Sequence, residues 1–451
     1  MHSDVFILFV HYHLNGGGVT KVIEQQSGAL TKLGIPHLVL CGENTSNSSI
    51  PQRIIPGLEY VSKEKSQFPE ITAASLLEKI TSVTELISKT HEGAKVIFHF
   101  HNHSIGLNYH YDELVSNLAH HFPLLLQIHD FIEDGRTQNR GNIGCFQKLY
   151  PKANHIQYCT INSRDKKILN SAGVTADLLP NTLATPARQP ASTQKKVFYP
   201  IQALRRKNLG ELLLIAMASP AEYSFQVALT PPESIDLVNY WSAIAQRLEL
   251  PIVFGDSNLD ATAFRQHYET ASHIVTTSIQ EGFGMTYIDP VYFQKPLFGR
   301  DLPEITIDLK NAGLHHPNLY TSIEIQFPDL QHEDFGNLNE VAQTHILQQI
   351  ALNPTLLNHI VVHLECVING ARSTISIKEY LEKVYSSTTP LPLEVIEPWT
   401  LQNVQSQLAD IYQKLAQSSL TKVTHLDYAQ IDTFFSQRPK HALKNAKFTA
   451  L

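Results

Sequence analysis

The sequence predicts an α/β protein made of two tandem doubly wound parallel-sheet domains, followed by a C-terminal helical extension. Three observations predict this fold. Short continuous apolar runs alternate with helical segments, which is typical of parallel sheets with crossover helices. The alternation stops at a linker and then starts again. A chain of 451 residues is also too long for one ordinary hydrophobic core.

In the first domain, residues 1–183, strands and helices alternate regularly. Apolar runs predict strands at 4–12, 37–43, 95–100, 123–131, 154–160 and 176–180. Glycine-opened or amphipathic segments predict helices at 16–34, 74–89 and 106–121.

A linker at 184–195 is indicated by small residues, prolines and a lack of periodicity. The second domain, 196–385, repeats the pattern with five strands joined by four helices. Its strands are expected at 196–201, 225–230, 251–256, 273–278 and 296–301. After a proline-rich break, the tail 386–451 is expected to form two helices that pack back on the first domain.

Composition excludes several classes of function. The chain has 35 basic and 42 acidic residues, a net charge of −7, and no basic block, which argues against nucleic-acid and anionic-membrane partners. No apolar run approaches the ~20 residues of a membrane span, and the N-terminus is typical of a first strand rather than a signal peptide. The four cysteines lack metal spacing and indicate reduced thiols in a cytoplasmic protein. A homodimer is left open.

Residues 276–306 are the most informative segment for function. Glu281 and Asp289 lie eight positions apart, and Gly282 and Gly284 stand between them at the start of a helical pattern. Such a glycine loop offers free N–H groups to a phosphate or another polar ligand. Eight residues of helix make just over two turns, so we expect both carboxylates on one face. They would then bind two hydroxyl-bearing parts of one ligand, as in a nucleotide sugar.

Histidines gather where strands of the first domain end, and ligands of open α/β sheets bind at such carboxyl ends. They are His11, His13, His99, His101, His103 and His129. A period of two places His99, His101 and His103 on one face if the strand extends that far. A metal site is one interpretation. A polar cleft is favoured over a metal site because no carboxylate or cysteine stands at metal-ligand spacing beside these histidines. As a purely structural alternative, a histidine at a strand end caps the following loop. His129, directly before Asp130, is expected to contact a sugar hydroxyl or a leaving phosphate.

Each domain has a characteristic first strand-to-helix turn. In the first domain Gly17 and Gly18 allow close approach of a ligand, although glycines are also ordinary turn residues. In the second domain Arg205, Arg206 and Lys207 precede a helix. A basic cluster at a helix N-terminus opposes the helix dipole, so it indicates either a bound anion or simple solvation. Its place at the proposed cleft favours the anion.

Together these residues resemble the GT-B glycosyltransferases, specifically the retaining family four (group 1), whose two domains are Rossmann-like. The matching motifs are Gly17–Val19, His129–Asp130, the basic turn, the segment 281–289 and Leu302–Ile305. The resemblance covers about residues 4–310. It implies that Lys207 and a neighbouring arginine, Arg205 or Arg206, hold the donor diphosphate, with Gly17 and Gly18 also on the donor side. It further implies that Glu281 contacts the donor sugar, Asp289 the ribose, and the N–H groups of Gly284, Met285 and Thr286 the sugar or phosphate.

By the same resemblance, His129, Glu281 and Lys207 are the catalytic residues, and His11, His13, His101, His103 and Asp130 lie on the acceptor side. The sequence departs from the family at two positions. Asp289 replaces the usual second glutamate, a mild change. Gln202 replaces the usual phosphate-binding arginine and cannot supply a charged bidentate fork, so Arg205 or Arg206 is expected to substitute for it.

The expected function is therefore retaining transfer of a hexosyl unit from a UDP- or GDP-hexose to a hydroxyl acceptor that is small and soluble. No metal is expected, since basic side chains and helix N-termini supply positive charge and the sequence has no DxD triplet. Two alternatives remain. A nucleotide-sugar 2-epimerase would share the fold, and a non-catalytic nucleotide-sugar-binding protein would fit the departures at Gln202 and Asp289.

Overall fold

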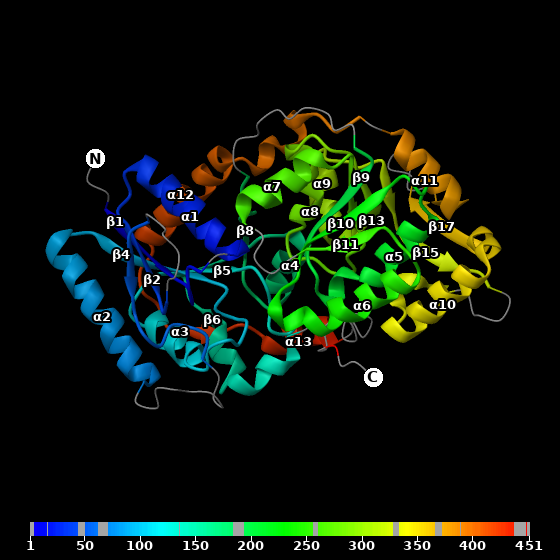
Figure 1. Ribbon diagram of the computed structural model, residues 1–451. Helices are drawn as coiled ribbons and strands as arrows, with labels where there is room; N and C mark the ends of the chain where they lie inside the picture. The colour runs from blue at the N-terminus through cyan, green and yellow to red at the C-terminus, as the bar shows by residue number, and fades with distance from the viewer. Residues whose placement is uncertain are drawn as a thin grey trace. The chain divides into compact units, whose positions relative to one another are not determined.

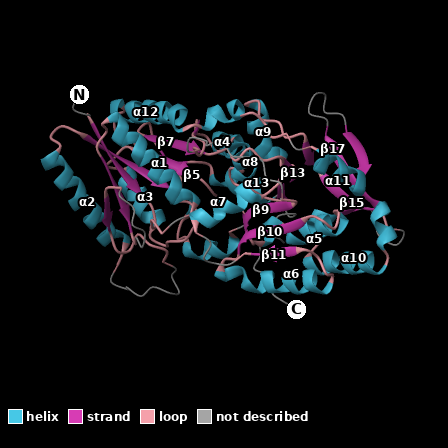
Figure 2. Cartoon of the chain, turned by 45° about the horizontal axis from the view of Figure 1, so that its top comes forward, coloured by secondary structure: helices cyan, strands magenta, loops and turns pink. Residues whose placement is uncertain are grey.

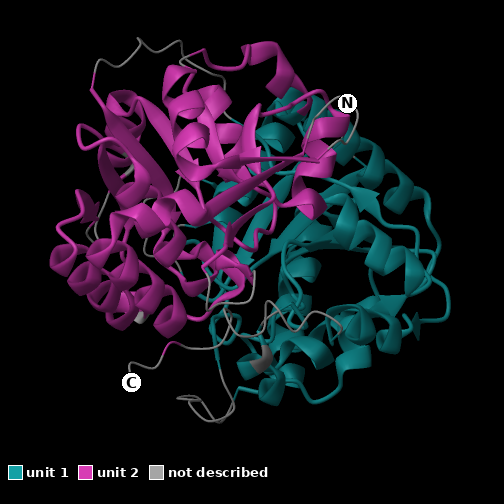
Figure 3. Cartoon of the chain, turned by 90° about the vertical axis from the view of Figure 1, so that its right-hand side faces the viewer, with its two compact units in different colours: residues 1–184, 399–438 teal, residues 185–398, 439–451 magenta. Residues whose placement is uncertain are grey.

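The computed structural model describes residues 4–15, 17–43, 50–61, 71–134, 136–183, 194–255, 260–327, 333–365, 372–387, 389–436 and 448. The chain divides into two compact units (Figure 3). Unit 1 consists of Met1–Ala184 and Trp399–Arg438, and unit 2 of Thr185–Pro398 and Pro439–Leu451. Most of the expected linker, residues 184–193, lies outside the described residues.

Unit 1 contains a seven-stranded parallel sheet in the described residues, in the order β3-β2-β1-β4-β5-β7-β8. Its strands are β1 (Val5–Val10), β2 (His37–Cys41), β3 (Gln52–Ile54), β4 (Lys95–His101), β5 (Leu124–Ile128), β7 (Ile156–Thr160) and β8 (Asp177–Leu178). The helices of this unit are α1 (Gly18–Leu33), α2 (Ala73–Thr90), α3 (Tyr111–Ala119), α4 (Ser163–Ser171), α12 (Leu401–Gln417) and α13 (Tyr428–Ser436). Short segments are β6 (Pro151–Lys152), β19 (Thr424–His425), η1 (Thr137–Asn142) and η2 (Phe146–Leu149).

Helices cover both faces of this sheet (Figures 1 and 2). Successive side chains of a strand point to opposite faces, and β1 follows this rule. Phe6, Leu8 and Val10 belong to the core that includes α2 and α3. Ile7 and Phe9 belong to the core that includes α1 and α12. Because both faces are buried, β1 is apolar throughout rather than alternating.

Residues 399–438 of the C-terminal segment are part of unit 1, whereas residues 386–398 and 439–451 belong to unit 2. Helix α12 buries Val404, Leu408 and Tyr412 in the core on the α1 face of the sheet. Helix α13 contributes Ile431 and Phe435 to the core on the opposite face. Between these helices, β19 pairs antiparallel with β6. The tail therefore supplies apolar side chains to both faces of the first sheet.

Unit 2 has a six-stranded parallel sheet in the described residues, in the order β11-β10-β9-β12-β13-β14. Its strands are β9 (Lys196–Gln202), β10 (Ser224–Leu229), β11 (Ile252–Phe254), β12 (His273–Thr276), β13 (Leu297–Arg300) and β14 (Asn318–Tyr320). The helices are α5 (Leu209–Ala218), α6 (Ile235–Arg247), α7 (Ala261–Thr270), α8 (Met285–Tyr292), α9 (Pro303–Asn311), α10 (Glu340–Leu352) and α11 (Ile377–Ser386). Short turns of 3-10 helix are η3 (Arg205–Lys207), η4 (Pro232–Ser234), η5 (Phe335–Asn337), η6 (Pro354–His359) and η7 (Leu393–Trp399).

Unit 2 also has a four-stranded antiparallel sheet in the order β16-β15-β17-β18. Its strands are β15 (Ser322–Ile325), β16 (Glu333–Asp334), β17 (Ile360–Glu365) and β18 (Arg372–Ser376). The predicted doubly wound sheets are confirmed, but β14 and this second sheet were not predicted. These strands are short, and most of them lack the continuous apolar runs of the main sheets.

The strand order places a topological switch point in each sheet, and ligands bind at such points beyond the carboxyl ends of the strands. In unit 1 the order reverses between β1 and β4, and in unit 2 it reverses between β9 and β12. The predicted site residues follow these four strands or their neighbours. No described helix has both the length and the apolar character needed to cross a membrane. Cys41, Cys145 and Cys159 carry free thiols, and Cys366 lies outside the described residues.

Candidate functional site

The basic turn of unit 2 lies between the end of β9 and the start of α5. It forms the single 3-10 turn Arg205–Lys207. Strand β12 neighbours β9 in the sheet, so the loop after β12 lies at the same carboxyl edge as the basic turn. The N–H of Ile279 in that loop donates to the carbonyl of Arg206 over 2.9 Å. The two loops are therefore joined by backbone as well as by side chains.

Lys207 and Glu281 form an ion pair across these two loops. The Nζ of Lys207 lies 2.5 Å from Oε1 of Glu281, and the two side chains are only 9% and 12% exposed. Burial lowers the pKa of Lys207, the negative charge of Glu281 raises it, and the neighbouring Arg206 lowers it further. The structure thus brings together the two unit 2 residues that the sequence analysis named as catalytic.

The two arginines of the turn have different surroundings. Arg205 makes a bidentate contact with Glu340 at the start of α10, with distances of 3.0 and 2.9 Å. The guanidinium of Arg206, by contrast, forms no ion pair or hydrogen bond with any residue that the structure describes. Gln202, at the end of β9, is exposed. Of the two expected substitutes for the missing family arginine, Arg206 is therefore the one whose charge is available to a ligand.

The glycine loop begins the helix later than expected. Helix α8 starts at Met285, and its N-cap Gly284 adopts the left-handed conformation with φ of 86°. Glu281 therefore lies in the loop before the helix, and its eight-residue separation from Asp289 is not two turns of one helix, as the sequence had suggested. A Cβ on Gly284 would meet Cγ2 of Ile305 at 2.7 Å, so both φ and packing require glycine here.

Helix α8 carries the remaining residues that were predicted to bind the donor. Thr286, in its first turn, has a buried Oγ1 without a hydrogen-bond partner in the described residues. Asp289 lies in the middle of the helix and is partly exposed. Burial and the charge of Asp289 both raise the pKa of the Tyr268 hydroxyl, which places this carboxylate near α7. The orphan hydroxyl of Thr286 is the more informative of these features, since buried polar atoms are normally hydrogen-bonded.

In unit 1 the structure brings three of the predicted histidines together. Nδ1 of His101, at the end of β4, lies 3.1 Å from Nε2 of His129, which follows β5. Nδ1 of His11, after β1, lies 3.1 Å from the carbonyl oxygen of His101. Burial lowers the pKa of His11 to about 3 and that of His129 to about 4, and the pKa of His101 is also well below its usual value. These rings are therefore neutral hydrogen-bonding groups near pH 7.

Asn102 orders the His129–Asp130 pair. It adopts a left-handed conformation with φ of 60°. Its Oδ1 accepts from the backbone N–H groups of His129 and Asp130 over 3.2 and 2.8 Å. The carboxylate of Asp130 pairs with Arg136 at 3.1 Å, and both side chains are partly exposed. Nδ1 of His129 makes no hydrogen bond with a described residue, so one nitrogen of this ring is available to a ligand.

His13 and His103, which were also predicted to lie on the acceptor side, have different surroundings. His13 is partly exposed and packs edge-on against Tyr60, with ring centroids 4.7 Å apart. His103 lies beyond the end of β4, which stops at His101, so the expected common face does not extend to it. Its Nε2 instead lies 2.9 Å from the carbonyl oxygen of Leu149. The structure therefore separates His103 from the His11–His101–His129 cluster.

The glycine turn of unit 1 is open. Gly17, the N-cap of α1, has φ of 100°, a conformation that side chains rarely adopt. A Cβ added at Gly17 or Gly18 would meet no atom within 4 Å. The turn therefore leaves room beside the first turn of α1, as a close approach of a ligand requires.

The described residues contain no group of three or more His, Cys, Asp or Glu arranged to hold a metal ion. Several histidines of unit 1 instead make contacts within the protein, although Nε2 of His101 is buried without a hydrogen-bond partner in the described residues. His99, for example, contacts the hydroxyl of Tyr412 at 2.8 Å and Oε1 of Gln127 at 3.0 Å. The polar-cleft interpretation stays a prediction.

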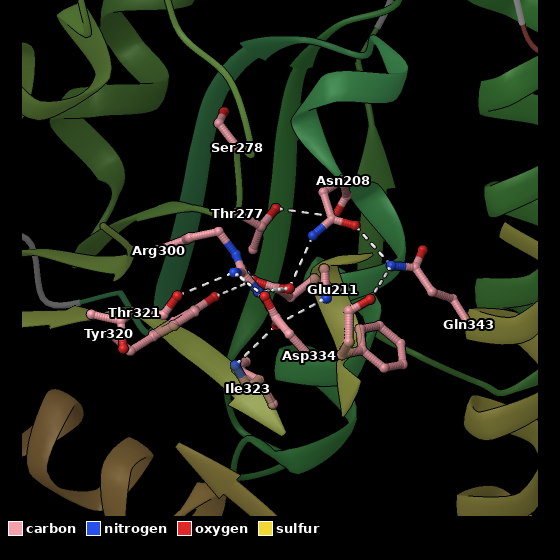
Figure 4. Close-up of polar contacts among 12 residues, drawn as sticks. Asn208, Glu211, Thr277, Ser278, Arg300, Tyr320, Thr321, Ile323, Asp334 and Gln343 are labelled. Atoms are coloured by element: carbon pink, nitrogen blue, oxygen red, sulfur yellow. Dashed lines mark hydrogen bonds and ion pairs between the residues drawn. The ribbon is translucent and has the colours of Figure 1, made fainter. Parts of the chain in front are cut away.

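A polar network next to the basic turn was not predicted from the sequence. It consists of Asn208, Glu211, Arg300, Asp334 and Gln343 (Figure 4). Arg300 immediately follows an apolar strand run and Asn208 follows the basic turn, so their positions at strand and turn ends were visible. Nothing local indicated that they contact one another, since Asn208 and Gln343 are 135 positions apart.

Comparison with known proteins supports the fold. No protein-family model matches the chain. The mannosylglucosyl-3-phosphoglycerate synthase of Petrotoga mobilis is 25% identical over 346 residues, which span 67% of this chain and 66% of that relative. The match therefore covers slightly less than two thirds of the relative's own length.

Solved structures match over most of the chain. Anabaena Alr3699/HepE in complex with UDP and glucose has a TM-score of 0.56 at 11% identity, covering 90% of this chain and 99% of that one. The lipopolysaccharide outer core galactosyltransferase WaaB, in its apo form, has a TM-score of 0.53 at 11% identity, covering 91% and 100%. At such low identity these likenesses concern the fold. The chain is accordingly a GT-B-fold protein, similar to glycosyltransferases of the family-four, group 1 type.

Proposed function

We propose that this protein is a retaining glycosyltransferase that moves a hexosyl unit from a nucleoside-diphosphate sugar to a hydroxyl acceptor. The observation that carries the proposal is the Lys207–Glu281 ion pair, which lies at the carboxyl edge where the strand order of unit 2 reverses. The pair joins a basic turn to a glycine loop that opens a helix. These are the parts needed for a diphosphate and a sugar at one place.

The donor binds to unit 2 in this proposal. Arg206 and Lys207 hold the diphosphate, and Arg206 provides the charge that Gln202 lacks. Glu281 binds hydroxyls of the sugar, and Asp289 those of the ribose. The N–H groups at Gly284 and Met285, together with the unpartnered hydroxyl of Thr286, bind the sugar or the phosphate. The donor is expected to be a UDP- or GDP-hexose, and two solved structures of similar fold hold UDP.

Catalysis would depend mainly on charge stabilisation. As the bond from the anomeric carbon to the diphosphate breaks, negative charge grows on the diphosphate, and the cations of Arg206 and Lys207 are already in place to stabilise it. These side chains and the start of α8 supply the positive charge that a metal would otherwise provide. The acceptor hydroxyl then attacks the anomeric carbon from the face that the diphosphate leaves and gives its proton to the departing diphosphate, so the configuration is retained.

Unit 1 is assigned to the acceptor. The neutral imidazole of His129 offers a hydroxyl its Nδ1, which has no partner among the described residues, while His11, His13, His101 and Asp130 form the polar surroundings. A small soluble acceptor is favoured by the low basic charge of the chain. The name of the Petrotoga relative, a mannosylglucosyl-3-phosphoglycerate synthase, agrees with an acceptor of that size. Cytoplasmic location and homodimer formation stay predictions.

A thermal-shift screen tests the proposal. UDP, GDP and their hexose derivatives are added to the purified chain, and a bound ligand raises the melting temperature. A nucleoside diphosphate and its sugar are expected to stabilise the native chain but not Lys207→Ala. If no nucleotide raises the melting temperature, the proposal is wrong. Positive donors are then incubated with and without candidate acceptors, because conversion of the donor sugar without any acceptor would indicate an epimerase.

A further inference from the structure

Asn208 is held at both ends of its side chain. It follows Lys207 directly and adopts a left-handed conformation with φ of 53° and ψ of 56°. Its Nδ2 donates to Oε2 of Glu211 over 2.9 Å, and its Oδ1 accepts from Nε2 of Gln343 over 2.8 Å (Figure 4). The side chain of Asn208 is therefore hydrogen-bonded to both α5 and α10.

The backbone of the same turn is held by two hydroxyl groups. The carbonyl of Lys207 accepts from the hydroxyl of Tyr199 on β9 and from Oγ1 of Thr277 after β12, each over 2.9 Å. The same Oγ1 lies 3.2 Å from the carbonyl oxygen of Asn208. The turn that presents Lys207 is thus fixed by contacts from β9, α5, α10 and the loop after β12.

Glu211 accepts hydrogen bonds from three residues of this network, Asn208, Arg300 and Tyr320. Its side chain is fully buried and accepts from Nε and Nη2 of Arg300 over 2.9 and 2.5 Å, and from the hydroxyl of Tyr320 over 2.6 Å. Arg300 also binds Asp334, with distances of 2.8 and 2.7 Å. The pKa of Asp334 is lowered: burial opposes the shift, and the adjacent guanidinium of Arg300 drives it. Two carboxylates therefore share one buried guanidinium.

Space for this ion cluster comes from Gly336. A Cβ there would lie 2.5 Å from Nη2 of Arg300 and 3.0 Å from Oε2 of Glu211. Burying charges is costly, and an apolar cluster of similar volume would often stabilise a protein equally well. A requirement for stability alone therefore does not account for the cluster, whereas a requirement for one fixed geometry at Asn208 does.

We infer that Glu211 and Arg300 are positioning residues of the donor site. Acting through the side-chain amide of Asn208, they hold the turn in the conformation that presents Arg206 and Lys207 to the diphosphate. Neither residue needs to touch the ligand. The inference rests on the proposed function, because it takes the basic turn to be the diphosphate site.

The residue type at 208 provides the means of testing this. Glycine adopts left-handed conformations more easily than asparagine, so conformation alone would favour glycine at this position. The Asn208→Gly variant keeps the allowed backbone and leaves the Glu211–Arg300 pair in place, but removes both side-chain links. It separates the role of those links from the stability of the fold.

The test measures the dissociation constants for UDP and GDP by calorimetry, with melting temperatures, for the native chain, Asn208→Gly, Glu211→Gln and the double variant. We expect each single variant to bind the preferred nucleotide about fivefold or more weakly, and the double variant to bind no more weakly than the weaker single variant, since residues that act through one another are not additive. In transfer assays Asn208→Gly should raise the KM for the donor and leave the KM for the acceptor unchanged.

Asp165→Asn is the matched control, because it disrupts a buried ion pair with Arg164 in unit 1. It should lower the melting temperature without changing nucleotide affinity. If the native chain binds nucleotides and the single variants bind them equally well, or if the two losses add, the positioning role is refuted while the proposed function stands. If Glu211→Gln does not fold, Asn208→Gly alone decides. A native chain that binds no nucleotide or nucleotide sugar overturns both proposals.

Discussion

The Nζ of Lys207 and Oε1 of Glu281 lie 2.5 Å apart, although 74 positions separate the two residues in the chain. Each charge is the other's partner in a site where both side chains are nearly buried. A diphosphate would bring its own negative charge to Lys207 and compete with Glu281 for it. Glu281 would then be released to accept hydrogen bonds from a sugar. Under the proposed function, donor binding is therefore expected to break this ion pair.

The Lys207–Glu281 pair gives the first prediction. Lys207→Ala and Glu281→Ala are each expected to lower kcat/KM for transfer by about 100-fold or more, because each removes a group that acts on the developing charge or on the sugar. Some loss of stability is expected as well, since each change leaves a nearly buried charge without its partner. Circular dichroism checks that both variants are folded. Full activity in both would refute the assignment of the site.

Arg206 and Arg205 give the second prediction. Arg206→Gln is expected to weaken nucleotide binding by about tenfold with little change in melting temperature, because its guanidinium has no partner among the described residues. Arg205→Gln breaks the bidentate contact with Glu340, where the side chains are 13% and 7% exposed, and is expected mainly to destabilise the fold. Calorimetry measures the nucleotide affinity of both variants, and thermal melts measure their stability. The reverse pattern would assign the phosphate role to Arg205.

The buried histidines of unit 1 give the third prediction. Burial lowers the pKa of His11 to about 3, and that of His103 and His129 to about 4. The unfolded chain binds these protons at higher pH than the folded chain, so the contribution to stability is present above the ordinary pKa of 6.5 and is lost as pH falls toward 4. Melting temperature should fall over this range. His103→Asn removes one such group, so the melting temperature of this variant should fall less steeply between pH 6.5 and 4. An equally steep fall would contradict the lowered pKa of His103.

Glu133 gives the fourth prediction, with the opposite sign. Burial raises its pKa to about 7, although hydrogen bonds from its own backbone and from Tyr150 oppose the shift. The folded state holds this proton more tightly than the unfolded state, so stability decreases as pH rises from about 4.5 to 7. Glu133→Gln removes the cost of ionisation. It should raise the melting temperature more at about pH 8 than at about pH 5. An equal effect at both pH values would contradict the raised pKa of Glu133.

Much of the fold was predictable because the hydrophobic pattern is local. Continuous apolar runs such as β1 and β9 indicate strands buried on both faces, and their alternation with helices indicates the doubly wound topology. The antiparallel sheet that contains β15 and β17 was missed, since its strands are short and partly exposed. The start of α8 was also misplaced. Gly284 adopts a left-handed conformation, so the helix begins only at Met285. The amino-acid sequence alone is also compatible with a helix that begins earlier.

The sequence by itself determined the GT-B class of the fold and named the residues of the candidate site, from Lys207 and Glu281 in one unit to His129 in the other. Tertiary structure alone decided how those residues are used. It paired Arg205 with Glu340, left Arg206 without a side-chain partner in the part of the chain that the structure describes, and bonded His103 to the backbone of Leu149 instead of to the histidine cluster. The physical reason is that hydrophobic periodicity acts between neighbours in sequence, whereas ion pairs and hydrogen bonds depend on which distant segments the folded sheet brings to one edge.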